Sequence, residues 1–102
     1  MNIDLLYFDG CPSWQMGLEN LRAALQREGI QAEIRLARVE DDAQAAELKF
    51  LGLPSFQVNG VDLWPEARTE YHLSCRVYST PEGMRGAPSV DMLQEKLRKI
   101  QN

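Results

Sequence analysis

The sequence has 102 residues, which is enough for one small domain and too short for a second. Hydrophobic residues make up 44% of it and charged residues 25%, a composition typical of globular chains and not of disordered ones. The formal net charge of -4, without a long basic run, argues against nucleic acid and anionic membranes as general partners. We therefore expect a single domain over residues 1–102.

The N-terminal residues carry neither a basic segment nor a cleavage site of small residues. The first apolar run, residues 5–8, is far too short for a signal peptide or a membrane span. These features favour a cytoplasmic protein, in which a reducing environment keeps cysteines as thiols at rest. Two cysteines and one histidine cannot form a four-thiolate zinc site, so we expect no standing metal centre and no cofactor.

The first half of the chain predicts alternating strands and helices. Residues 3–8 combine β-branched, aromatic and aliphatic side chains and predict a buried strand. Apolar side chains then recur at helical spacing over residues 13–29 and predict a helix that stops at a glycine. Residues 32–39 alternate apolar and charged side chains, as a strand does. A second helix follows, with acidic residues 41 and 42 as its candidate caps and Gly52 as its end.

The second half begins with a hairpin. Asn-Gly at residues 59–60 suits a type I′ turn, which needs positive φ at both central positions, and it joins short strands in residues 54–58 and 61–64. Ser89 is the predicted cap of a last amphipathic helix. Residues 65–88 show no clear period and are either a functional loop or the place of a short element.

The predicted order is β-α-β-α-β-β-α. The first three elements must form a right-handed crossover with parallel strands, and the hairpin adds an antiparallel pair. We therefore expect an α/β fold with a central mixed four-stranded sheet flanked by helices, and an irregular insertion before the last helix.

Cys11 stands between the first strand and the first helix. It precedes Pro12, and proline is favoured at the first position of a helix, so Cys11 is the predicted N-cap. Unpaired backbone N–H groups and the helix dipole favour negative charge there, so the thiol should ionise more readily than a free cysteine. The alternative is a small, buried and inert residue.

Three stretches carry a resemblance to a known group of proteins: FDGCPSW at 8–14, GLPSF at 52–56 and YHLSCRVY at 71–78. With the element order, they resemble the thioredoxin and glutaredoxin superfamily, and within it small bacterial thioredoxin-like proteins, some of them alkylmercury lyase-like. The resemblance implies that Cys11 is the reactive thiol and that Pro54 is a cis-proline packed beside it. A cis-proline would turn the backbone so that Leu53 pairs with an extended thiol substrate. The alternative for Pro54 is an ordinary trans proline at a strand start.

The motif departs from the two-cysteine pattern of that superfamily. Trp14 occupies the fourth position of Cys-Pro-Ser-Trp, so the usual internal disulfide across one helical turn cannot form. A mixed disulfide with glutathione or a protein remains open, as in monothiol glutaredoxins. Trp14 lies on the apolar stripe of its helix, which favours a core role, although it could also wall a pocket. Ser13 would either donate a hydrogen bond to the thiolate or cap the helix.

Cys75 is the second thiol. It would act as a distant resolving cysteine if its loop folds over the first turn, with Arg76 helping to hold a sulfur as thiolate. Two thiolates brought together would also suit a soft cation such as mercury or copper(I). The alternative is a buried core cysteine in a short strand.

The sequence leaves three functions open. The first is a thiol–disulfide oxidoreductase or monothiol redox protein that acts on the thiol or disulfide of a small molecule or protein. The others are a non-catalytic binding module, and a soft-metal or organomercurial binder that uses both cysteines. The candidate catalytic residues are Cys11 and Cys75. The candidate substrate-binding residues are Pro12, Ser13, Trp14, Leu53, Pro54 and Arg76.

Overall fold

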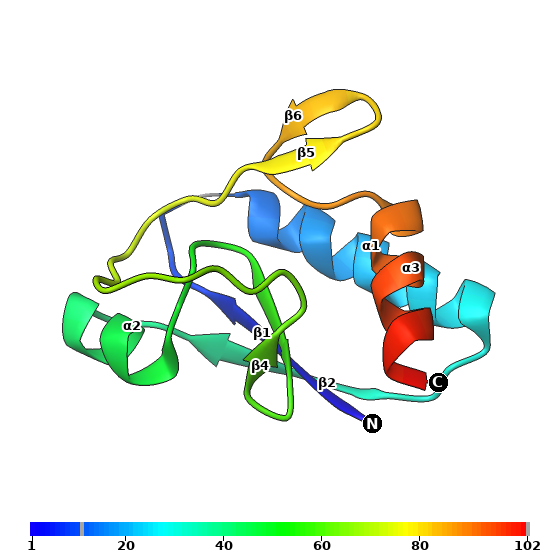
Figure 1. Ribbon diagram of the computed structural model, residues 1–102, viewed down its shortest axis with the longest axis horizontal. Helices are drawn as coiled ribbons and strands as arrows, with labels where there is room; N and C mark the ends of the chain where they lie inside the picture. Colours follow the sequence, from blue (N-terminus) through cyan, green and yellow to red (C-terminus); the bar gives the residue numbers. More distant parts are fainter. Residues whose placement is uncertain (11, 102) are drawn as a thin grey trace.

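The structure, a computed structural model, describes residues 1–10 and 12–101. Its strands are β1 (Asn2–Tyr7), β2 (Glu33–Arg38), β3 (Ser55–Val58), β4 (Val61–Asp62), β5 (Tyr78–Thr80) and β6 (Gly83–Arg85). Its helices are α1 (Ser13–Glu28), α2 (Asp42–Leu48) and α3 (Val90–Gln101). Figure 1 shows their arrangement in a compact α/β domain.

The predicted mixed four-stranded sheet is confirmed, with strand order β2-β1-β3-β4. β1 runs parallel to β2 and antiparallel to β3, and β3 pairs antiparallel with β4. The parallel pair follows from the crossover through α1, and the antiparallel pair from the hairpin. Asn59 and Gly60 both have positive φ, 55° and 80°, as the predicted turn requires.

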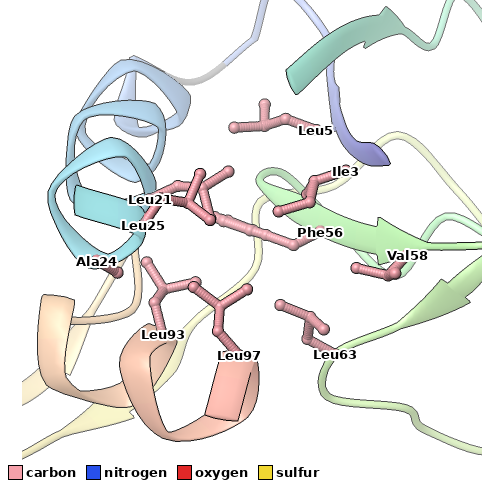
Figure 2. Close-up of a cluster of buried hydrophobic side chains, with 10 residues drawn as sticks. All are labelled: Ile3, Leu5, Leu21, Ala24, Leu25, Phe56, Val58, Leu63, Leu93 and Leu97. Carbon is pink, nitrogen blue, oxygen red and sulfur yellow. The ribbon is translucent and has the colours of Figure 1, made fainter. Parts of the chain in front are cut away.

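The sheet separates two apolar cores, because successive side chains of β1 point to opposite faces. Ile3 and Leu5 face the larger core, which Figure 2 shows between the sheet, α1 and α3. Leu6 faces the smaller core on the side of α2. Phe56 of β3 is fully buried in the larger core, where the leucines of α1 and α3 close over it.

The end of α2 differs from the prediction. The helix stops at Leu48, and Lys49 takes the left-handed conformation with φ 55°, so Gly52 lies beyond the helix. The earlier stop turns Phe50 into the smaller core, where its side chain is fully buried. Gly52 has φ 114°, and a Cβ there would lie 2.9 Å from the Cβ of Arg76. Its missing side chain therefore makes room for the segment that contains Arg76.

The stretch without a period, residues 65–88, contains short strands, which is one of the two alternatives that the sequence left open. An extended segment leads from β4 past α2 to a short antiparallel hairpin of β5 and β6, which Figure 1 shows above α1. α3 then begins as predicted, with the backbone N–H of Met92 donating to Oγ of Ser89 at 3.2 Å.

Candidate functional site

The turn between β1 and α1 leads to the candidate thiol. Cys11 itself lies outside the described residues, but its predicted role as N-cap is wrong, because the N-cap of α1 is Pro12. Pro12 was expected as the first helical residue, but α1 begins one residue later and Pro12 stands at the N-cap position without a side-chain cap. The reason is a tight first turn, in which the Pro12 carbonyl accepts from Gln15 N–H at 3.4 Å.

Pro54 lies against the first turns of α1. The Leu53–Pro54 peptide bond is cis, as expected from the resemblance. A Cβ added to Gly17 would meet Pro54 Cγ at 3.0 Å and Phe56 Cζ at 3.2 Å, so the absence of a side chain at Gly17 is what allows α1 to come this close. Pro54 is fully buried, and its carbonyl accepts a hydrogen bond from the Tyr78 hydroxyl at 2.6 Å.

The backbone of Leu53 pairs with the chain itself. Leu53 N–H donates to Ser74 O at 2.8 Å, and Arg76 N–H donates to Leu53 O at 2.9 Å. These bonds form an isolated parallel bridge between Leu53 and Cys75. The Leu53 N–H and C=O, which were expected to bind an external thiol substrate, are therefore both hydrogen-bonded to residues 73–76 of the same chain, called the cysteine segment below. The Leu53 side chain is fully buried.

Cys75 is exposed and disulfide-bonded. The alternative that it is a buried core cysteine is therefore wrong: it lies before β5 in the segment that bridges Leu53. The sequence contains one other cysteine, Cys11. Exposed disulfides are more often the labile, regulatory or catalytic ones than buried disulfides are.

Arg76, next to Cys75, holds a buried ion pair. Its side chain and that of Asp62 are each 6% exposed, and its Nη1 donates to both carboxylate oxygens of Asp62 at 3.0 and 3.1 Å. Its Nη2 donates to Trp64 O and lies 3.4 Å from the Glu66 carboxylate. The guanidinium also sits 5.0 Å from the ring centre of Tyr78. We expected this charge to hold a thiolate, but its contacts balance it against carboxylates of the β4 region instead.

Burial dominates the electrostatics of this cluster. It raises the pKa of the Asp62 carboxyl, although Arg76 and the Trp64 N–H favour the charged form. Burial also raises the pKa of the Tyr78 hydroxyl well above its ordinary value. Tyr78 therefore keeps its proton at any working pH and remains the donor to Pro54 O.

Trp14 and Ser13, the two other candidates on α1, have separate surroundings. Trp14 is half-buried, packs against both cores and stacks on Tyr7 with ring centres 4.5 Å apart, in line with the core role that its stripe favours. Ser13 packs closely on Gly86, where an added Cβ would lie 2.8 Å from Ser13 Oγ. A cleft of about 580 Å³ opens beside them, lined by Pro12, Ser13, Met16, Asn20, Thr80, Glu82, Arg85, Gly86, Ala87, Pro88, Ser89 and Val90.

Asp42 holds the other side of the cysteine segment, a role that sequence reasoning missed. Its Oδ1 accepts from Leu73 N–H at 3.0 Å, and its Oδ2 lies 3.5 Å from His72 Nδ1. These contacts lower the pKa of the Asp42 carboxyl, the Leu73 N–H most and His72 next. Asp41 is the residue that caps α2, since its Oδ1 accepts from Gln44 N–H at 2.8 Å. Nothing in the local pattern separates the two adjacent aspartates.

Comparison with models of known families, with curated proteins and with solved structures finds no match for this chain. Within residues 1–10 and 12–101, no helix is long and apolar enough to cross a bilayer. The same part of the chain holds no group of three or more His, Cys, Asp or Glu side chains arranged to bind a metal ion. The geometry around Cys75 is thus the basis for a functional proposal.

Proposed function

We propose that this protein is a thioredoxin-like thiol–disulfide exchange protein whose redox pair is Cys11 and Cys75. One observation carries the proposal: an exposed, disulfide-bonded Cys75 is bridged to Leu53 immediately before a cis-proline. Because the chain has two cysteines, an internal disulfide of Cys75 requires Cys11. Gly17 supports the same pairing, since it brings the first turns of α1 onto Pro54.

Cys75 would take the role of the second cysteine of the usual Cys-x-x-Cys motif, whose position Trp14 occupies in this chain. An incoming thiolate attacks one sulfur of the protein disulfide, forms a mixed disulfide and releases the other cysteine as a thiolate. A second substrate thiolate then attacks the mixed disulfide, so the substrate leaves as a disulfide and the protein keeps both electrons as a dithiol. A thiolate near the start of α1 is favoured by the helix dipole. In a cytoplasmic setting, such a disulfide would be transient, as catalytic and redox-sensing disulfides are there.

Turnover of a small disulfide tests this function. Wild-type protein should reduce hydroxyethyl disulfide when glutathione, glutathione reductase and NADPH supply electrons, and Cys11→Ser should abolish that activity. Treated with oxidised glutathione alone, without reductase or reduced glutathione, Cys75→Ser should remain as a stable mixed disulfide with glutathione, visible by intact-mass measurement, because no second protein thiol is left to displace the glutathione. Ser79→Ala, on the exposed face of β5, is the matched control and should behave as wild type. Activity that persists in Cys11→Ser would refute the proposed pair.

Capture of a soft cation is the second candidate, because a disulfide-bonded cysteine has another sulfur within bonding distance. After reduction, two adjacent thiolates would suit the linear two-sulfur coordination of mercury or copper(I). Titration of the reduced protein with Hg²⁺ against a competing thiol should then saturate at one ion per chain. Equal affinity in wild type and in either single cysteine variant would eliminate this function.

A further inference from the structure

The segment that carries Cys75 is held on both of its sides by contacts other than the disulfide. Before the cysteine, Asp42 binds the Leu73 N–H and Ser74 O accepts from Leu53. After it, Arg76 N–H donates to Leu53 O. The position of the cysteine is thus fixed by its neighbours on each side.

Arg76 links this segment to the sheet through its side chain as well. Its Nη1 donates to both oxygens of Asp62, the last residue of β4, and β4 pairs with β3, which follows Pro54. A single residue therefore binds the backbone just before the cis-proline and the strand that folds back after it. In the described part of the chain, no buried side-chain polar atom is left without a hydrogen-bond partner. The Arg76–Asp62 pair, called the clamp below, therefore leaves no fully buried side-chain polar atom unpaired, and a buried polar network whose members are paired makes the surrounding structure more rigid.

We propose that Arg76 is a positioning residue for thiol exchange: held by Asp62, it keeps Cys75 paired with Leu53, next to Pro54, in the reduced protein as well as in the oxidised one. The inference rests on the proposed function and adds a residue pair to it. A thiol held in place by packed, hydrogen-bonded neighbours has a far higher effective concentration toward its partner than a thiol on a flexible loop. Closure of the disulfide should therefore depend on the Arg76–Asp62 pair.

The redox equilibrium of the folded protein tests this role. Wild type, Asp62→Asn and Arg76→Lys are equilibrated in buffers of reduced and oxidised glutathione, quenched with acid, alkylated and counted by mass. We expect the equilibrium constant for closing the protein disulfide to fall about tenfold or more in Asp62→Asn, with a mixed glutathione disulfide accumulating in its place. Arg76→Lys keeps a positive charge and the backbone hydrogen bond to Leu53, but it loses the planar guanidinium that binds Asp62 and Trp64 together. Its equilibrium constant for disulfide closure should therefore fall by a smaller factor than in Asp62→Asn.

A second ion pair, remote from Cys75, separates positioning from general destabilisation. Glu28 binds Arg98 at 3.0 Å between α1 and α3, away from the cysteine segment. A loss of stability shared by both redox states leaves the equilibrium constant unchanged, so Glu28→Gln should match wild type. If Asp62→Asn does not fold, Arg76→Lys decides the question.

Wild-type values in both clamp variants, or in Arg76→Lys alone when it is the only one folded, would overturn the positioning role and leave the proposed function intact. An equal fall in Glu28→Gln would overturn it as well. A wild-type protein that does not exchange with glutathione at all would instead remove the proposed function, and the inference with it.

Discussion

Gly17 decides how closely α1 approaches Pro54. In an exposed helix interior, glycine to alanine stabilises by about 1 kcal/mol, because alanine loses less backbone freedom on folding. Here the new Cβ would lie 3.0 Å from Pro54 and 3.2 Å from Phe56, two fully buried rings that have no room to withdraw. The packing cost should therefore outweigh the helix propensity.

We expect Gly17→Ala to lower the free energy of unfolding by about 1 kcal/mol, since overpacking a core typically costs about 1–3 kcal/mol. Urea unfolding followed by circular dichroism measures the change. Glu19→Ala on the exposed side of the same helix is the control and should lie within about 0.5 kcal/mol of wild type. A Gly17→Ala protein more stable than wild type would show that α1 does not rest on Pro54 as described.

Residues whose role depends on their chain neighbours were predictable, and those whose role depends on distant partners were not. The cap at Ser89 and the positive φ at Asn59 follow from local backbone chemistry. Arg76 was assigned to a sulfur because it adjoins Cys75, yet its charge is balanced by Asp62, which only the folding of the 65–77 segment onto β4 brings near. Sequence adjacency says nothing about where a long side chain ends.

At the scale of elements, the segment between β4 and β5 is the part that sequence periodicity could not describe. It has little regular structure, and β5 and β6 have three residues each, too short for an alternating pattern to stand out. Its shape is set by single contacts from other elements, such as Asp42 at the start of α2. The adjacent Asp41 and Asp42 therefore act on different elements.

Removing the Asp42 carboxylate should loosen the cysteine segment and spare α2. We expect Asp42→Ala to accelerate amide hydrogen exchange at Leu73, because its acceptor is lost, while Asp41→Ala weakens α2 by about 1 kcal/mol and leaves Leu73 protected. The pKa of Asp42 is lowered in the fold, so its contribution is present above the ordinary carboxyl range and is lost as pH falls through the lowered pKa.

Protection of Leu73 in wild type, corrected for intrinsic exchange, should accordingly decline in acid and be restored as pH rises. Asp42→Ala should show no such pH dependence. Protection that is the same in Asp42→Ala and in wild type at neutral pH would mean that the aspartate does not hold the segment.

For the whole molecule, the sheet was the most predictable feature. A strand, a helix and a second strand in the same sheet fix the parallel pair of β1 and β2, and an Asn-Gly turn fixes the antiparallel pair of β3 and β4. The alternation along β1 then requires helices on both faces, with α1 and α3 on one side and α2 on the other. The pairing of Leu53 with Cys75 was not predictable, because it depends on where a segment without sequence periodicity passes the sheet.

The fold places a segment of the chain itself at the expected substrate position. The sequence pointed to an open edge at Leu53 that would receive a thiol from outside. The fold fills that edge with the segment around Cys75, so the chain supplies its own extended cysteine. This arrangement supports the internal two-cysteine cycle that we propose.

The most direct test of the central claim is a glutathione redox titration of the wild-type protein, with the disulfide mapped by peptide mass at each step. We predict one reversible two-electron transition between a dithiol and a single Cys11–Cys75 disulfide, while circular dichroism shows the same fold at both ends. A disulfide between chains, or cysteines that remain independent thiols across the whole range of glutathione potentials, would contradict the account.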